Sequence, residues 1–235
     1  EIEDLVPLDQ YHARGIAATI ELADKLNFNK NSTIIDIGCG LGGPARYFSK
    51  RFNCNVYGID ITEAFIEIGN YFNKLTQIDH QVKLLKGDGE NLPYQTEFFD
   101  GAVSQHVTMN IEDREQFFNE AFRVLKKGAI FGFSEHGLGS KGSPIFPLPW
   151  ADNEDMSFLK TPEYTKSLLK KIGFKNIKII STGEKYISGY NSLLKKGQSN
   201  EKPTLGIHVI GGDSMLERSK NCLLYTSDAA DDWSG

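Results

Sequence analysis

The chain lacks several features that would place it in a specialised class of protein. Its three cysteines, Cys39, Cys54 and Cys222, show no C-x-x-C spacing. A set this sparse and odd in number excludes a disulfide framework and favours a reducing, cytoplasmic setting. No apolar run is long enough to cross a bilayer, so no membrane span is expected. The 26 Lys and Arg residues are outnumbered by 31 Asp and Glu residues, which argues against nucleic acid as a partner.

What the 235 residues do contain is a regular alternation of short apolar runs and amphipathic segments. Strands are predicted at 34–37, 56–60, 82–86, 99–104 and 129–134, and a helix at 112–127 with Gly128 as its C-terminal cap. This alternation predicts an α/β fold, a Rossmann-like doubly wound and mostly parallel sheet with helices on both faces. A further strand is predicted at 177–180. We expect the final antiparallel strand to be missing, because no candidate remains after Met215.

The most informative segment is a buried-strand pattern that runs into a glycine loop, Ile34-Ile35-Asp36-Ile37-Gly38-Cys39-Gly40-Leu41-Gly42-Gly43. Glycines 38, 40 and 43 satisfy G-x-G-x-x-G, a pattern that also fits a dinucleotide-binding turn. Asp36 argues against a dinucleotide at this loop, since a negative charge there gains nothing beside a pyrophosphate. An acid at this position favours a cationic ligand.

Two further acids follow strands of the predicted sheet. Asp60 ends the second strand, 20 residues after Gly40, where a carboxylate can accept both hydroxyl groups of an adenosine ribose. Asp88 lies in Gly87-Asp88-Gly89-Glu90 after the third strand and is placed to accept from an adenine amine. Each acid alone is also typical of an ordinary turn or helix cap. Three acids at successive strand ends together indicate an adenosine-containing ligand.

These residues carry a resemblance to class I S-adenosylmethionine-dependent methyltransferases. Segments at 36–40, 60, 87–93, 105–110 and 123–126 support it, over a match from about Leu8 to Gly212. Within that superfamily the chain is similar to the small-molecule branch of sarcosine/dimethylglycine, tocopherol and sterol methyltransferases. Two segments carry this closer similarity: Asp9-Gln10-Tyr11-His12-Ala13-Arg14-Gly15 and Phe146-Pro147-Leu148-Pro149-Trp150.

The resemblance implies transfer of a methyl group from S-adenosyl-L-methionine to a small-molecule acceptor, with no metal site. It places the cofactor against Tyr11, Asp36, Gly38, Cys39, Gly40, Asp60, Ile61, Asp88, Gly89 and Gln105. It places the acceptor against Tyr11, Met109, Asn110, His136 and Trp150. His106 is the candidate general base, needed for a phenol or a carbon acid but not for a neutral amine. A histidine here is equally typical of a residue that only lines a pocket.

The expected domain organisation is simple. Residues 1–220 form a methyltransferase domain with an N-terminal helical cover and a lid-like insertion near 137–160, a stretch rich in Gly, Ser and Pro. The alternative for that stretch is a solvent-facing excursion anchored by its aromatic residues. Residues 221–235 are interpreted as a non-native tail, because they resemble a translated sequencing-library adaptor and show no helix or strand periodicity. The alternative is a natural, disordered polar tail.

Two other functions compete with methyl transfer. A nicotinamide-dependent oxidoreductase shares the glycines and Asp60, but it leaves Asp36 and the turn around Asp88 unexplained. A non-catalytic protein that only binds S-adenosylmethionine is compatible with every motif above. The sequence identifies neither the acceptor atom nor the oligomeric state.

Overall fold

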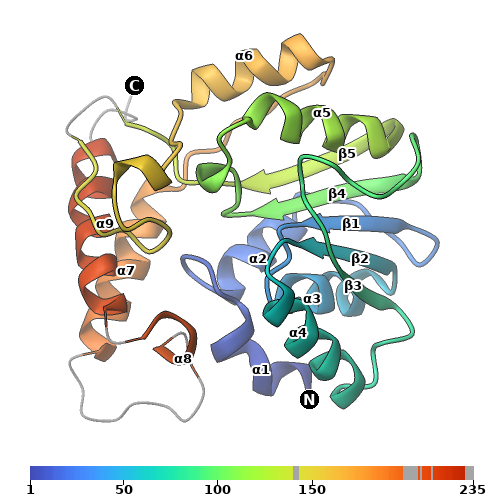
Figure 1. Cartoon of the computed structure of the whole chain (residues 1–235), viewed down its shortest axis with the longest axis horizontal. Coiled ribbons are helices and arrows are strands. Elements are labelled where there is room, and N and C mark those ends of the chain that lie inside the picture. Colours follow the sequence, from blue (N-terminus) through green and yellow to red (C-terminus); the bar gives the residue numbers. More distant parts are fainter. Residues whose placement is uncertain (140–142, 198–205, 207, 213, 231–235) are drawn as a thin grey trace. The chain divides into compact units, whose positions relative to one another are not determined.

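The computed structural model describes residues 1–139, 143–197, 206, 208–212 and 214–230 (Figure 1). The chain divides into two compact units. The first unit comprises Glu1–Val107 and Asp113–Glu135, and the second comprises Thr108–Glu112 and His136–Gly235. Within the described residues, no helix combines the length and apolarity needed to span a bilayer.

The first unit is built on a parallel sheet of order β3-β2-β1-β4-β5. Its strands are β1 (Thr33–Ile37), β2 (Asn55–Asp60), β3 (Val82–Lys86), β4 (Phe99–Gln105) and β5 (Leu125–Ser134). Strand order reverses between β1 and β4, so the ends of these strands meet at a topological switch point, where open α/β sheets bind ligands. The predicted fold class is confirmed, and among the described residues the sheet has no antiparallel strand.

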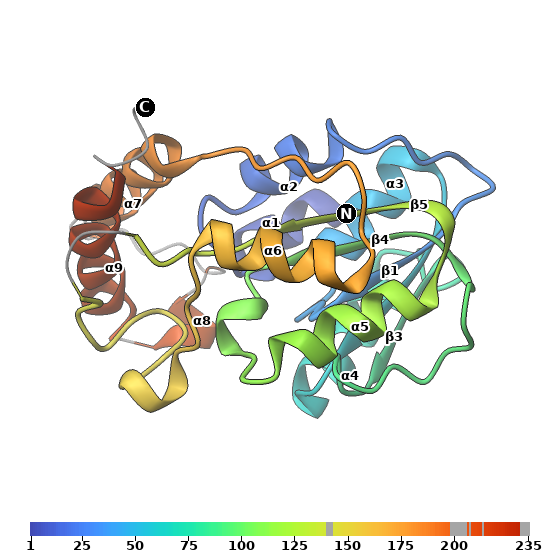
Figure 2. The same cartoon turned by 90° about the horizontal axis from the view of Figure 1, so that it is seen from above.

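Helices cover both faces of this sheet. They are α1 (Ile2–Asp9), α2 (Ile16–Ala23), α3 (Gly43–Phe52), α4 (Glu63–Leu75) and α5 (Arg114–Val124). Figure 2 shows α2 and α3 on one side of the sheet and α5 on the other. Alternate residues of each strand face opposite sides. Phe133 therefore meets Phe118 of α5, with ring centroids 5.4 Å apart, while its neighbour Gly132 faces Leu22 and Leu26 on the opposite side.

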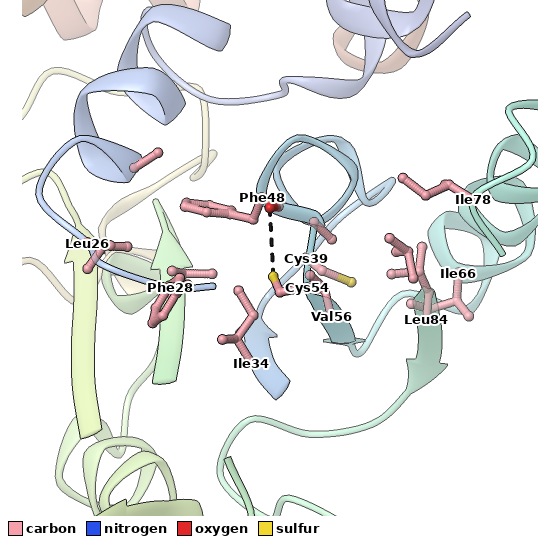
Figure 3. Close-up of a cluster of buried hydrophobic side chains, with 14 residues drawn as sticks. Leu26, Phe28, Ile34, Cys39, Phe48, Cys54, Val56, Ile66, Ile78 and Leu84 are labelled. Atoms are coloured by element: carbon pink, nitrogen blue, oxygen red, sulfur yellow. Dashed lines mark hydrogen bonds between the residues drawn. The ribbon is translucent and has the colours of Figure 1, made fainter. Parts of the chain in front are cut away.

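The α2/α3 face holds the main hydrophobic core (Figure 3). Phe48 of α3 is fully buried and belongs to the same cluster as Ile34, Val56 and Leu84 from three neighbouring strands. The thiol of Cys54 donates to the carbonyl oxygen of Phe48 at 3.8 Å. Burial of each large apolar side chain contributes about 1.5–3 kcal/mol, and this core fixes the strand whose end carries the glycine loop.

The second unit is mainly helical. It contains η1 (Thr108–Asn110), η2 (Glu154–Met156), α6 (Pro162–Ile172), α7 (Gly183–Gly197), α8 (His208–Gly211) and α9 (Met215–Ala230). Thr161 caps α6, accepting from the backbone N–H of Tyr164 at 3.2 Å, with Pro162 in the first turn. Helices α7 and α9 pack side by side, as Figures 1 and 2 both show.

Three expectations about local structure are wrong. Residues 177–180 form no strand, and Ile179 and Ile180 are about half exposed. Strand β5 begins at Leu125, so Gly128 lies inside a strand at φ 79° rather than capping a helix. Residues 221–230 are helical despite their lack of apolar periodicity, because Cys222 is buried and its thiol donates to the hydroxyl of Tyr190 at 3.2 Å.

A buried ion pair joins the N-terminal segment to the sheet. Arg46 of α3 donates to the carboxylate of Asp9, at the end of α1, at 2.8 Å, and both side chains are inaccessible to solvent. The same guanidinium donates to the carbonyl oxygen of Leu41 and to Asn73 of α4, each at 2.7 Å. A Cβ atom at Gly43 would lie 2.2 Å from the carbonyl oxygen of Asp9. The glycine therefore permits the close approach that the ion pair holds.

We expect Arg46→Ala to lower the free energy of unfolding by about 3–5 kcal/mol, because it leaves the carboxylate of Asp9 buried without a partner. Lys50→Ala is the matched control, since Lys50 joins the same two helices through Glu3 but is exposed, and its loss costs at most about 1 kcal/mol. Urea unfolding of the two variants measures the difference. Equal losses would contradict a special role for the buried pair.

Candidate active site

The glycine loop that follows β1 is fastened to the end of β2 by backbone hydrogen bonds. The N–H groups of Gly38 and Cys39 both donate to the carbonyl oxygen of Ile59, at 2.7 and 3.0 Å. The N–H of Gly40 donates to Oδ2 of Asp60 at 2.8 Å. Asp60, the acid predicted at the end of the second strand, is thus brought directly to the glycine loop.

The two glycines at 38 and 40 are required for different reasons. Both have positive φ, at 80° and 53°, a conformation that glycine adopts without strain. A Cβ atom at Gly38 would lie 2.2 Å from a methyl carbon of Val107, so this glycine permits close packing. A Cβ atom at Gly40 would meet nothing within 4 Å. The backbone at Gly40 therefore borders open space, as a ligand contact requires.

Asp60 has both carboxylate oxygens engaged by backbone groups. Oδ2 accepts from Gly40, and Oδ1 accepts from the N–H of Thr62 at 2.9 Å. The carboxylate thus has the turn role that a lone acid often has. Each oxygen retains a second lone pair, and the next residue, Ile61, leaves 69% of its surface exposed. A carboxylate beside an exposed apolar side chain suits a ribose and the base attached to it.

Asp36 is the most unusual group of the site. It is 1% exposed, and among the described residues its Oδ2 has no hydrogen-bond partner. Burial, with a smaller contribution from the negative charge of Asp60, raises the pKa of the Asp36 carboxyl to about 7. A buried carboxylate without a partner is costly, so this position is suited to a cationic or hydrogen-bond-donating ligand.

Asp88 forms the Asp-Gly turn that the sequence offered as its simpler interpretation. Its Oδ1 accepts from the N–H of Glu90 at 2.9 Å, and its carbonyl oxygen accepts from Asn91 at 3.1 Å. The following glycine, Gly89, is packed tightly, since a Cβ atom there would lie 2.9 Å from Phe117. The turn therefore has a structural role, and contact of Asp88 with adenine stays a prediction.

Gln105 and His106, at the end of β4, meet the N-terminal segment. Gln105 is 6% exposed, with Oε1 accepting from the hydroxyl of Thr19 at 3.2 Å and Nε2 unpartnered among the described residues. His106 has φ 57°, and its ring stacks on His12 with centroids 5.7 Å apart and planes 4° apart. Burial lowers the pKa of His12 to about 4, so His106 faces a neutral ring at pH 7.

The network behind this stack contains two polar residues that were not predicted as candidate site residues: His12, whose ring stacks on that of His106, and Gln10, whose side chain contacts that of His12. Nε2 of His12 lies 3.1 Å from the hydroxyl of Thr19, which donates to Oε1 of Gln10 at 2.6 Å. Gln10 and His12 belong to a segment used only for the resemblance. The signal that could have identified them is a pair of polar side chains next to a short helix. The pairing of Asp9 with Arg46 had no such signal, because the two residues are 37 positions apart in the sequence.

Three of the predicted acceptor residues lie together in the second unit. Trp150 stacks on His136 with centroids 4.7 Å apart, and it packs in a cluster with Met109 and Leu159. Burial lowers the pKa of His136 to about 4. Asn110 is exposed, and Tyr11 belongs to the first unit, where it is half-buried. Membership of one acceptor pocket therefore stays a prediction for these five residues.

Two tyrosines that the sequence did not single out complete the second unit's aromatic cluster. Tyr186 packs edge-on against His136 at 5.2 Å, and the hydroxyl of Tyr190 lies 3.3 Å from Nε2 of the same histidine. Burial, together with the nearby Cys222 thiol, raises the pKa of Tyr190 well above its usual value. The cluster is thus neutral and largely dry, which suits apolar contacts.

A switch-point sheet with a glycine loop and acids at successive strand ends defines the Rossmann-like class of nucleoside-binding α/β proteins. Residues 35–133 match the family model of a methyltransferase domain. The resemblance to class I S-adenosylmethionine-dependent methyltransferases is thereby confirmed. The curated relatives described next are named as methyltransferases of small molecules.

Two curated relatives and one solved structure show the extent of the similarity. Sterol 24-C-methyltransferase of Candida albicans is 33% identical over 51% of this chain, which spans about a third (32%) of its length. Sarcosine/dimethylglycine N-methyltransferase of Halorhodospira halochloris is 26% identical over 94% of this chain and 77% of its own. Phosphoethanolamine N-methyltransferase 2 of Haemonchus contortus, solved with S-adenosyl-L-methionine, shares the fold with a TM-score of 0.78 and 19% identity, over 93% of this chain and 51% of that one.

The raised pKa of Asp36 makes the stability of the unliganded protein depend on pH. Between its ordinary value of 3.8 and about 7, the unfolded chain releases a proton that the folded chain retains, so stability falls as pH rises through this window. We expect the difference in unfolding free energy between the wild type and Asp36→Asn to fall by up to about 1.4 kcal/mol per pH unit there.

Urea unfolding at several pH values from 4 to 8 measures this difference, in which the other titrating groups cancel. Asp79→Asn, at an exposed position, is the control and should differ from the wild type by a constant. A constant offset for Asp36→Asn as well would show that its carboxyl titrates normally.

Proposed function

We propose that the protein transfers a methyl group from S-adenosyl-L-methionine to a small-molecule acceptor. The observation that carries this proposal is the buried carboxylate of Asp36, two residues before the glycine loop, whose Oδ2 lacks a hydrogen-bond partner among the described residues. A cationic nucleoside supplies the missing positive charge, whereas the anionic pyrophosphate of a nicotinamide dinucleotide would add to the repulsion.

The residues present fit this cofactor. Asp36 would balance the ammonium of its methionine part, and the open backbone at Gly40 would lie along it. Asp60 would accept from the ribose hydroxyl groups with its remaining lone pairs, and Ile61 would cover the adenine. Three further assignments rest on the resemblance: Gly38 beside the methionine part, and Cys39 and Tyr11 as further cofactor contacts. Asp88, Gly89 and Gln105 complete the proposed set.

S-adenosylmethionine, when bound, supplies an electrophilic methyl group on a positively charged sulfur. The chain's own contribution is chiefly orientation, because bringing donor and acceptor into line is worth up to about 7–11 kcal/mol in well-oriented reactions. Asp9 and Arg46 hold the N-terminal segment against the glycine loop. That segment carries Tyr11 and His12, so the ion pair positions groups that would exclude water from the reacting atoms.

His106 is proposed as the group that receives the acceptor's proton. The stacked, neutral ring of His12 fixes the plane of its imidazole without adding a positive charge. The backbone N–H of His106 donates to the carbonyl oxygen of Ser134 at 2.8 Å, which anchors its position at the end of β4. An imidazole held at this place is the kind of group that accepts a proton in general base catalysis.

We infer from the relatives that the acceptor is a small amine or a sterol-like lipid rather than nucleic acid. Met109, Asn110, His136 and Trp150 are its proposed contacts, with Tyr11. The net charge of −5 adds no electrostatic attraction for a polyanion. The scarcity of cysteine supports a cytoplasmic setting.

The first experiment compares ligands by thermal unfolding. We expect S-adenosylmethionine and S-adenosylhomocysteine to raise the midpoint, since a ligand at about 100 times its Kd adds about 2.7 kcal/mol, while a nicotinamide dinucleotide leaves it unchanged. Asp60→Ala should lose the shift and Asp79→Ala should keep it. Stabilisation by the dinucleotide alone would overturn the proposal in favour of an oxidoreductase.

The second experiment separates an enzyme from a binding protein. Release of S-adenosylhomocysteine is measured with sarcosine, phosphoethanolamine and a sterol as trial acceptors. With the acceptor that turns over, His106→Gln should lower kcat by about 10²–10⁴ if proton removal accompanies transfer, while the cofactor-induced thermal shift is retained. An unchanged kcat would remove His106 from the chemistry and favour a neutral amine as acceptor.

A further inference from the structure

Helix α4 presents an apolar stripe to solvent. Ile68, Tyr71 and Leu75 keep 44%, 62% and 61% of their surface exposed, and Ala64 is exposed one turn earlier. The spacings of four, three and four residues place all of them on one side of the helix. Scattered exposed hydrophobic residues need no explanation, but a continuous stripe over the whole helix does.

This stripe lies opposite the face by which α4 packs on the first unit. The buried residues of the helix are Ile66, Gly69 and Asn73, and Gly69 approaches the side chain of Leu84. At about 100° per residue, the mean direction of the buried set and that of the stripe differ by about 165°. The stripe therefore points away from the core and is accessible to another molecule.

We propose that α4 is a homodimer interface in which two copies of the helix pack antiparallel about a two-fold axis. With Ile68 of one copy level with Tyr71 of the other, Ala64 lies level with Leu75 of the other. Each of these pairs is one layer of the contact and sets a smaller side chain against a larger one. The two-fold axis generates each pair twice, which gives four layers. A self-complementary surface of this kind is what a two-fold interface requires.

The flanks of the stripe fit the same register. Glu67 and Lys74 lie on one flank, both exposed and, in the described part of the chain, both without an ion-pair partner. Within one helix the two residues are about 10 Å apart along the axis. In the antiparallel register Glu67 is level with Phe72 of the second copy, two residues from Lys74 of that copy, so the two charges differ by only about 3 Å along the axis. Two ion pairs form in this way, one at each end. On the other flank, Phe65 lies near Phe72 of the second copy, and Phe72 near its Phe65.

The charges favour a second copy over a lipid surface. Membrane-lying helices carry Lys and Arg on both sides of the apolar stripe, whereas α4 has Glu63 and Glu67 there and one lysine, Lys74. The chain's net charge of −5 opposes anionic headgroups further. A four-layer contact is small, so the dimer is expected to be weak and concentration-dependent.

Sedimentation velocity of the full chain over about 1–500 µM tests the proposal. We expect a monomer–dimer equilibrium whose Kd rises about tenfold or more in Ile68→Ser. Glu67→Lys and Lys74→Glu alone should each raise the Kd, because each sets like charges against one another, and the double swap should restore it to within about threefold.

Ile145→Ser and Lys170→Glu are matched controls at exposed positions outside α4, and both should dimerise as the wild type does. Circular dichroism and thermal unfolding confirm that each variant is folded. A monomer at every concentration would overturn the proposal, and so would a dimer that Ile68→Ser leaves intact. Failure of the double swap to restore association would overturn it too, since the antiparallel register requires the pairing. None of these results depends on methyl transfer.

Discussion

The buried pair of Asp9 and Arg46 is the interaction on which the proposed site depends. Burying two charges is costly, and the further hydrogen bonds that the guanidinium donates to Leu41 and Asn73 offset only part of that cost, because burial still raises the pKa of Asp9. One side chain thereby joins four segments: the N-terminal helix, the glycine loop, α3 and α4. Gly43 lets the first and third of these approach. The position of the N-terminal segment, and with it of the His12 stack, follows from that one contact.

A second buried acid, Asp36, differs from Asp9 in that no cation pairs with it in the described part of the chain. Arg46 has several acceptors, whereas Asp36 has an oxygen without any donor in the described part of the chain. Burial raises the pKa of the Asp36 carboxyl to about 7 in the unliganded protein. The carboxyl can therefore hold a proton, and the neutral form avoids part of the cost of burying a charge. A fold that retains such a group in the central strand of its sheet loses stability there, and sites that bind ligands commonly show this loss. The ambiguity of the glycine pattern is resolved by this residue more than by the glycines.

Much of the first unit was predictable from sequence, because its strands are short apolar runs bounded by glycine and acids and its loops are local. Asp36 and Asp60 could be assigned to one edge for the same reason. The pairing of Asp9 with Arg46 was not predictable, since the partners are far apart in sequence and neither shows a local pattern. The helix over 221–230 was also missed, because its helicity depends on packing against α7 rather than on apolar periodicity.

The two halves of the proposed chemistry differ in how they are built. The cofactor contacts come from consecutive strand ends of the first unit, so backbone geometry and a few glycines determine them. The proposed acceptor residues Met109, His136 and Trp150 come from separate stretches of the second unit, where side-chain packing determines their arrangement. Substitutions in that aromatic cluster change the shape and polarity of a surface without disturbing the sheet. Acceptor specificity can therefore change independently of cofactor binding, which explains why the glycine loop indicates the methyl donor and gives no information about the acceptor.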